Sequence, residues 1–165
     1  MKKYELTAEF IEKWGKKLFR IKALISFGSV EAGELGGYVE KEDNLAQDGD
    51  AWVYGNARVY GDAEVYGNAR VYGDARVCGN ADYLLIGRIG SRFSFTTFFK
   101  NKDKGITVSC GCFLGTIAEF RAKVTDTHGN NKHAKIYNLA ADMAELQILG
   151  EEHFDKLNTN KSEPF

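Results

Sequence analysis

Apolar residues recur with a period of six through the middle of the chain. Valine stands at the first place of five consecutive hexads that begin between Val53 and Val77, and alanine stands at the fifth place of each. Glycine holds the third place, and asparagine or aspartate holds the fourth. A period of six fits neither a 3.6-residue helix nor a hairpin meander, so each hexad is predicted to form one short strand and one turn. Valine suits a narrow interior, and Gly-Asn or Gly-Asp suits turns that need positive φ.

The repeat also predicts which residues lie next to each other. Three hexads would close one coil of about eighteen residues, with coils about 4.8 Å apart. Tyr54 is then expected to stack on Tyr72, and Arg58 to lie over Arg76 in a like-charge pair that is mildly unfavourable unless something bridges it. Strict hexads of this kind resemble the left-handed parallel β-helix of hexapeptide-repeat proteins. Weaker hexads continue upstream, so such a β-helix is predicted for residues 35–82.

The segments on either side of the hexads are predicted to cover them. An open end of a solenoid exposes strand edges and core, so residues 1–34 are expected to form an N-terminal β cap. Within it, Lys2–Leu6 and Leu18–Ile25 are expected as strands, and Thr7–Trp14 as a helical turn.

After Asp82 the hexads stop, and residues 83–150 are predicted to form an α+β module. Phe93–Phe99 and Ile106–Cys112 are expected to pair as a hairpin. Two helices follow. The first is predicted from a capping box of Thr116 with Glu119 to Gly129, and the second from Lys132 to about Leu149; residues 151–165 are expected to be a polar tail. The predicted fold class is therefore mainly β, a short left-handed parallel β-helix with an N-terminal β cap and a C-terminal module of a β-hairpin plus two helices.

Composition narrows the possible partners and the compartment. The formal net charge of −1 argues against a general binder of nucleic acid, and duplex DNA in particular is not expected. The three cysteines do not make a disulfide framework, and MKKYELTAEF lacks the apolar core of a signal peptide. No apolar run approaches the length that spans a membrane. These features predict a protein of a reducing cytoplasm that does not bind membranes.

Catalytic residues are not evident in the hexads. Hexapeptide-repeat acyltransferases use a catalytic histidine on or beside a coil, and a metal-dependent hydratase would need several, but residues 35–82 contain none. Cys110 and Cys112 with His128 could be interpreted as a metal cluster, although zinc sites usually use C-x₂₋₄-C spacing. One cysteine packed inside and one outside is the favoured interpretation. The expectation is a protein that is not an enzyme, with no metal, no cofactor and no catalytic residue.

A candidate anion site follows the last hexad. Gly87 and Gly90 permit close approach of the backbone, and Arg88, Ser91 and Arg92 could clasp a phosphate. A glycine-kinked strand with solvated basic side chains is the alternative. Because the positive stretch is short, a phosphate-bearing small molecule fits better than duplex DNA. The complete set of candidate ligand-binding residues is Gly87, Arg88, Gly90, Ser91, Arg92, Thr96, Thr97, His128 and Asn130.

Four segments of the chain resemble a group of small hexapeptide-repeat proteins encoded by bacteriophages and prophages. The matching residues are GELGGYVEKEDNLAQDGDAWVYGNARVYG (33–61), IGRIGSRFSFTTFF (86–99), CGCFLGTIAEF (110–120) and THGNN (127–131). Such proteins are often labelled hexapeptide transferases or polymer-forming proteins. The resemblance implies a viral protein in a bacterial cytoplasm, and left-handed β-helices commonly form trimers.

Three functions are compatible with these features. The first is a non-catalytic homo-oligomer, favoured as a trimer, that sequesters a small anionic, nucleotide-like ligand; by analogy with phage sponges, this ligand could be a signal of bacterial immunity. The second is a hexapeptide-repeat acyltransferase or a nucleotide hydrolase. The third is a structural or protein-binding inhibitor of a host factor. Fold alone does not choose among them.

Overall fold

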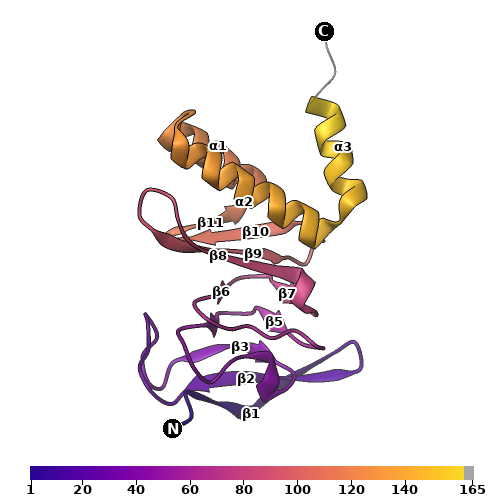
Figure 1. Cartoon of the computed structure of the whole chain (residues 1–165). Helices are drawn as coiled ribbons and strands as arrows, with labels where there is room; N and C mark the ends of the chain where they lie inside the picture. Colours follow the sequence, from indigo (N-terminus) through magenta and orange to yellow (C-terminus); the bar gives the residue numbers. More distant parts are fainter. Residues whose placement is uncertain (162–165) are drawn as a thin grey trace.

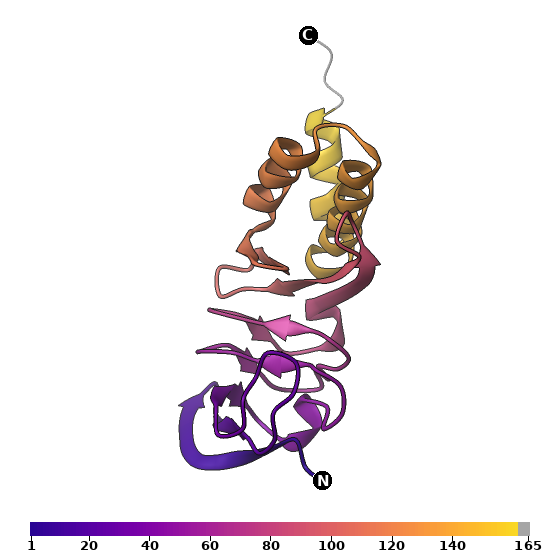
Figure 2. The ribbon, with the colours of Figure 1, turned by 90° about the vertical axis from the view of Figure 1, so that its left-hand side faces the viewer.

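The computed structural model describes residues 1–161, which form an elongated molecule built in layers. Figure 1 shows a hairpin at the N-terminal end, then the hexads, then an antiparallel sheet, and finally the helices at the C-terminal end. Figure 2, at right angles to this view, shows the same order of layers. The hexads therefore lie between two non-repetitive parts of the chain.

The N-terminal hairpin consists of β1 (Tyr4–Lys13) and β2 (Lys16–Ala23), which pair antiparallel. Trp14 and Gly15 form its turn, both with positive φ, of 51° and 74°. The helical turn predicted for Thr7–Trp14 is therefore wrong. Pairing with β2 keeps this segment extended, and local spacing of apolar residues does not reveal a partner strand.

The hexads contribute two-residue strands that pair in parallel. β3 (Leu35–Val39) pairs with β5 (Arg58–Val59), which pairs with β7 (Arg76–Val77). Separately, β4 (Trp52–Val53) pairs with β6 (Arg70–Val71). Partners in the regular hexads are eighteen residues apart, as in Val53 opposite Val71, which is the spacing that the repeat predicts.

The predicted interior and stacking of the hexads are largely confirmed. The first-place valines and the fifth-place alanines up to Ala75 are at most 1% exposed. The rings of Tyr54 and Tyr72 stack with centroids 4.1 Å apart, and Arg58 lies opposite Arg76. Ala81 departs from the pattern and is exposed, because it belongs to a short 3₁₀ turn, η2 (Asn80–Asp82), that ends the repeat.

The predicted fold class is wrong. The described strands form three separate sheets, which are a mixed five-stranded sheet in the order β1-β2-β3-β5-β7, a two-stranded sheet of β4 and β6, and a four-stranded antiparallel sheet in the order β11-β10-β9-β8. Each regular hexad contributes at most two residues to a strand, and its other residues lie outside the strands. The antiparallel hairpin β1–β2 belongs to the same sheet as the hexad strands β5 and β7. A mainly β, left-handed parallel β-helix capped at its ends therefore does not describe this fold.

The four-stranded sheet separates the hexads from the helices. It contains β8 (Tyr83–Ile89), β9 (Ser94–Lys100), β10 (Ile106–Cys110) and β11 (Phe113–Thr116), so the predicted hairpin is present as part of a larger sheet. Alternate residues face opposite layers. Phe99 packs with the hexad valines, whereas Phe98 packs with the helices.

Three helices cover the outer face of this sheet or extend beyond it. α1 (Ile117–His128) begins at the predicted capping box, in which Thr116 and Glu119 bond each other's backbone N–H groups. α2 (Lys132–Leu149) follows as predicted. α3 (Glu151–Lys161) occupies the segment predicted as a tail, so that prediction is wrong up to residue 161, and the rest of the predicted tail lies outside the described residues. None of the described helices is both long enough and apolar enough to cross a membrane.

The two helices α1 and α2 are joined by an ionic cluster. Arg121 on α1 contacts Asp142 at 2.6 Å and Glu145 at 2.8 Å, both on α2. The guanidinium also donates to the Asn138 side-chain oxygen at 3.1 Å. Only 10% of the Glu145 side chain is exposed, so this charge depends on Arg121 for its compensation.

Lys3 is a buried amine beneath the hexads. It is 2% exposed, and its ammonium donates to the carbonyl oxygens of Asp48, Gly49 and Ala51. Burial lowers the pKa of Lys3 from 10.5 to about 8, although nearby Asp48 and Asp50 act in the opposite direction.

The shifted pKa of Lys3 predicts how stability depends on pH. The unfolded chain keeps this proton up to about pH 10.5, whereas the folded chain releases it near pH 8, so a rise in pH between these values favours folding. We expect a gain of about 1–2 kcal/mol between about pH 8 and pH 9.5. Burial raises the pKa of the Tyr4 and Tyr83 phenols, so both stay protonated in this range. Urea denaturation at both pH values measures the gain.

Lys3→Met provides the control for this prediction. The variant lacks the titrating amine, so its stability should change less over the same interval than that of the wild type. An equal gain in both proteins would assign the pH dependence to other groups.

Candidate functional site

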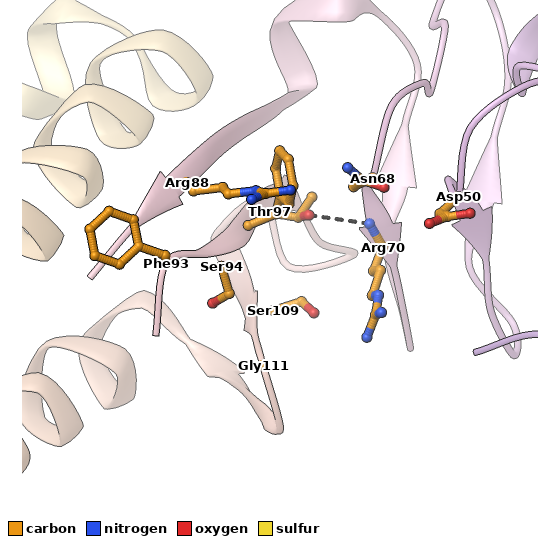
Figure 3. A pocket seen from close by; sticks show the side chains of 10 residues that line it. Asp50, Asn68, Arg70, Arg88, Phe93, Ser94, Thr97, Ser109 and Gly111 are labelled. Atoms are coloured by element: carbon orange, nitrogen blue, oxygen red, sulfur yellow. Dashed lines mark hydrogen bonds between the residues drawn. The ribbon is translucent and has the colours of Figure 1, made fainter. Parts of the chain in front are cut away.

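A cavity, called the polar cavity here, lies where the hexads meet the four-stranded sheet. Its volume is about 410 Å³. Figure 3 shows its side chains, which come from β6 and the hexad turns on one side and from β8, β9 and β10 on the other. The lining residues are Asp50, Asn68, Arg70, Arg88, Phe93, Ser94, Phe95, Thr97, Ser109 and Gly111.

The hexad register and the sheet pairing position these residues. Asp50 and Asn68 hold the fourth place of hexads eighteen residues apart, and the Asp50 N–H donates to the Gly67 carbonyl at 2.9 Å. Thr97 joins the two layers, because its hydroxyl accepts from the Arg70 N–H at 3.2 Å. Ser109 lies opposite Thr97 in the pairing of β10 with β9. The cavity therefore depends on contacts between distant parts of the sequence.

The polar cavity has an excess of positive charge. Arg70 and Arg88 contribute two guanidinium groups, whereas Asp50 contributes the single carboxylate. Neither arginine is within ion-pair distance of a carboxylate in the part of the chain that the structure describes. In Figure 3 the Arg88 side chain extends toward Thr97, while the Phe93 ring points to the opposite side. The site can therefore offer guanidinium donors and three hydroxyls to an anion.

A smaller neighbour, called the apolar cavity here, lies between the sheet and the helices. Its volume is about 160 Å³. Its walls include Phe113, Phe120 and Tyr137, and its lining shares Ser94 and Gly111 with the polar cavity. Its cationic and titratable lining residues are Arg92, Lys123 and His128, and its remaining lining residues are Ser91, Cys110, Cys112, Val124 and Thr127. A polar cavity thus adjoins an apolar one.

Tyr137 is the central residue of the apolar cavity. Burial raises its pKa, with a further contribution from Cys110, while Arg92 acts in the opposite direction. The His128 ring lies nearly parallel to the Tyr137 ring, with centroids 5.8 Å apart. Tyr137 therefore stays protonated near neutral pH, and it offers the cavity an apolar ring and a hydroxyl group.

The structure distributes the nine predicted residues among several places. Arg88 and Thr97 line the polar cavity, whereas Ser91, Arg92 and His128 line the apolar cavity. Asn130 lines a third, shallower hollow beside Lys135. The predicted clasp of Arg88, Ser91 and Arg92 around one phosphate is therefore divided between two adjoining cavities.

The remaining three of these residues have structural roles. A side chain at Gly87 would overlap the Phe95 ring, and one at Gly90 would overlap the Tyr137 hydroxyl. Thr96 is fully buried, and its hydroxyl donates to the Cys110 sulfur at 3.2 Å. Thr96 thus faces away from Thr97, as neighbouring residues of a strand do.

Sequence reasoning missed most of the polar cavity. Asp50, Asn68 and Arg70 could have been found, because the eighteen-residue register places Asp50 beside Asn68 and Trp52 opposite Arg70. Ser109 and Gly111 carried no such signal, because the predicted hairpin brings them beside β9 but does not indicate that β9 packs against the hexads.

No described group of three or more His, Cys, Asp or Glu side chains is arranged to hold a metal ion. All three cysteines are free thiols. Cys110 is half-buried on β10, and Cys112 is exposed beyond Gly111, which has a φ of 58°. This agrees with the interpretation of one inner and one outer cysteine.

The comparisons with known proteins concern the hexads. Residues 51–65 and 63–79 match the family model described as YdcK Beta solenoid repeat. No curated protein matches the chain. Among the lining residues of the polar cavity, only Asn68 and Arg70 fall in the matched stretches. These two stretches are therefore similar to β-solenoid repeats of this family.

Proposed function

We propose that this protein is a non-catalytic binding protein for a small anionic, nucleotide-like ligand, held in the polar cavity. One observation carries the proposal. Arg70 and Arg88 line a cavity of about 410 Å³, and neither has a carboxylate at ion-pair distance among the described residues. Guanidinium groups bind phosphate oxygens in a bidentate manner, and the volume falls within the usual range for small-ligand sites.

The other lining residues favour a nucleotide over a simple phosphate. Asp50 accepts hydrogen bonds only, so it would repel a bare anion but could bind a sugar hydroxyl or an amine. Asn68 can donate and accept. The adjoining apolar cavity offers Phe113, Phe120 and Tyr137 to a ring or another apolar group. A ligand with an anionic end and a less polar end would match both compartments.

The same lining supports binding without turnover. A general base must lie within hydrogen-bond reach of its nucleophile. The hydroxyls of Ser94, Thr97 and Ser109 line the polar cavity, and no described hydrogen bond joins any of them to a carboxylate or an imidazole. No described histidine lines the polar cavity, and His128, which lines the adjoining apolar cavity, lies beside His133 and Tyr137.

The biological setting is proposed from the sequence resemblance. We infer a phage or prophage protein that acts in the cytoplasm of a bacterial host and sequesters a nucleotide signal of immunity. A homotrimer is proposed from the same resemblance, because hexapeptide-repeat proteins commonly form trimers.

Binding of candidate ligands tests the proposal directly. Calorimetry with a panel of cyclic nucleotides and cyclic ADP-ribose isomers should identify a ligand that binds at a fixed stoichiometry. Arg70→Gln and Arg88→Gln should each weaken its binding by at least about tenfold, because each removes one charge-assisted contact. Lys135→Gln, which removes a cation from a different hollow, should leave the affinity unchanged within about twofold.

Three results would contradict parts of this proposal. If no nucleotide binds, or if the double variant Arg70→Gln/Arg88→Gln binds as well as the wild type, the polar cavity is not the site. If mass spectrometry recovers a cleaved ligand instead of the intact one, the protein is an enzyme. Native mass spectrometry of the complex reports the number of subunits, and a monomer would refute the proposed assembly.

A further inference from the structure

A second basic surface lies at the tip of the N-terminal hairpin, and it shares no lining residue with the polar cavity. It consists of Trp14, Arg58, Tyr60 and Arg76 and is called the Trp14 surface below. Its arginines belong to β5 and β7, whereas the polar cavity uses Arg70 of β6 and Arg88 of β8. Figure 1 shows the tip of the hairpin formed by β1 and β2 on the same side as β5 and β7.

Trp14 is held in a conformation that a bulky residue rarely adopts. Its φ is 51°, at a turn position where asparagine, aspartate or glycine is usual. Its ring stacks on Tyr60, with centroids 4.8 Å apart and planes inclined by 25°. Half of the residue, 50%, is exposed. The hairpin thus presents a large, partly open aromatic platform in a fixed position.

Arg58 and Arg76 form the like-charge pair that the repeat predicts. They lie opposite each other on neighbouring parallel strands, which are about 4.8 Å apart. Their guanidinium carbons lie 5.8 and 5.3 Å from the centre of the Trp14 ring. Two stacked cations repel each other unless an anion or an aromatic face compensates them.

Three nearby carboxylates are paired with lysines. Asp74 contacts Lys102 at 3.1 Å, Asp82 contacts Lys100 at 3.5 Å, and Glu40 contacts Lys16 at 2.9 Å. Neither arginine of the pair contacts a carboxylate at ion-pair distance within residues 1–161. The Trp14 ring is therefore the described partner of both guanidinium groups.

Two hollows adjoin this pair. One, of about 310 Å³, is lined by Tyr38, Asn56, Arg58 and Arg76, together with Ile11, Asp74 and Ala75. The other, of about 210 Å³, is lined by Trp14, Tyr60, Arg76 and Lys104, together with Cys78, Asp82, Lys100, Asn101 and Lys102. Arg76 lines both hollows, so an anion bound to it could also reach Arg58 on one side and Lys104 on the other.

We propose that the Trp14 surface is a second ligand site, which binds the diphosphate group of a nucleoside diphosphate between Arg58 and Arg76 while the base stacks on Trp14. Phosphate oxygens accept bidentate bonds from guanidinium groups and would relieve the repulsion within the pair. Aromatic side chains stack on any base with little sequence preference. No bond is made or broken at this site. The proposal stands on residues separate from the polar cavity and does not depend on the function proposed for it.

The intrinsic fluorescence of Trp14 offers a direct measurement. The chain has two tryptophans, and Trp52 is fully buried, so a ligand on the surface changes the emission of Trp14. Titration with ADP should give a saturable change. Inorganic diphosphate should compete with ADP but bind more weakly, because it lacks the base. Trp14→Phe should lose the signal and still bind ADP in calorimetry, since phenylalanine retains a stacking face.

Charge variants decide the assignment of the arginines. Arg58→Gln/Arg76→Gln should weaken ADP binding at least about tenfold, whereas Lys135→Gln, in a hollow that shares no residue with this surface, should leave it unchanged. If the first variant loses its near-ultraviolet circular dichroism, Arg58→Lys and Arg76→Lys replace it, because lysine keeps the charge but lacks the bidentate fork. Each should weaken binding about threefold or more.

Several outcomes would overturn this inference. Equal ADP affinity in wild type and in the folded arginine variants would do so. Sulfate at matched ionic strength that produces the same fluorescence change would show that the surface responds to any anion. Tighter binding of an unphosphorylated single-stranded oligonucleotide than of ADP would assign the surface to nucleic acid instead. None of these results bears on the polar cavity, whose ligand is tested with its own variants.

Discussion

Replacing Trp52 with alanine is expected to lower the free energy of unfolding by about 3–5 kcal/mol. Trp52 is fully buried, and its ring meets Tyr4 and Phe27 edge to face, with centroids 6.1 and 5.4 Å apart. Its indole N–H has no hydrogen-bond partner among the described residues, so the loss comes from packing and from the cavity left behind. Urea denaturation followed by circular dichroism measures the change.

Trp14→Ala is the matched control, because it removes the same side chain from a half-exposed position. Its ring contacts Tyr60 and the two arginines but fills no interior space, so the expected loss is about 1 kcal/mol. Equal losses for the two variants would show that the buried ring contributes no more than the exposed one. That result would contradict the conclusion that Trp52 stabilises the core by filling interior space.

Arg121→Met is expected to destabilise the protein by about 2–4 kcal/mol. The substitution keeps most of the apolar stem but leaves the carboxylates of Asp142 and Glu145 without their shared cation. The loss falls mainly on Glu145, whose side chain is 10% exposed, while Asp142 at 37% can be solvated. The change is measured by urea denaturation, and the loss of helix signal reports on the contact between α1 and α2.

Two further variants isolate the ionic contribution at Arg121. Lys2→Met breaks the exposed pair of Lys2 with Glu42, so it should change stability by less than about 0.5 kcal/mol. Arg121→Met/Glu145→Leu removes the buried carboxylate as well and should regain a large part of the loss. If the double variant were less stable than Arg121→Met, the unpaired Glu145 charge would not be the cause.

Local signals predicted α1, α2 and the interior of the hexads well. The capping box at Thr116 is formed by neighbouring residues, so the sequence contains the whole motif. The hexad valines are likewise identified by spacing alone. Sheet organisation was predicted less well, because the pairings of β1 with β2 and of β8 with β9 have no local signature. The predicted fold class was therefore based mainly on the repeat and missed how the other strands form sheets.

The candidate site shows the same contrast between local and distant information. Arg88 and Arg92 are close in sequence and were assigned to one anion, but Gly90 lies between them with a φ of 78° and packs against Tyr137. The chain reverses there, so the two arginines line different cavities. Arg70 is the arginine that shares a cavity with Arg88. The spacing of the hexads gives the position of Arg70 within the repeat, but it does not indicate that Arg70 lies near Arg88.

The register of the hexads constrains how this protein could change its length during evolution. Arg70 meets Thr97 at the last hexads before the sheet, and the hexads below repeat the same arrangement every eighteen residues. Duplication of eighteen residues could lengthen the molecule and keep equivalent side chains stacked on one another, since partners lie eighteen residues apart. Duplication of six residues between Arg70 and the sheet would bring a different position of the hexads to Thr97 and would dismantle the polar cavity. Related proteins that keep this cavity should therefore differ in length by whole multiples of three hexads.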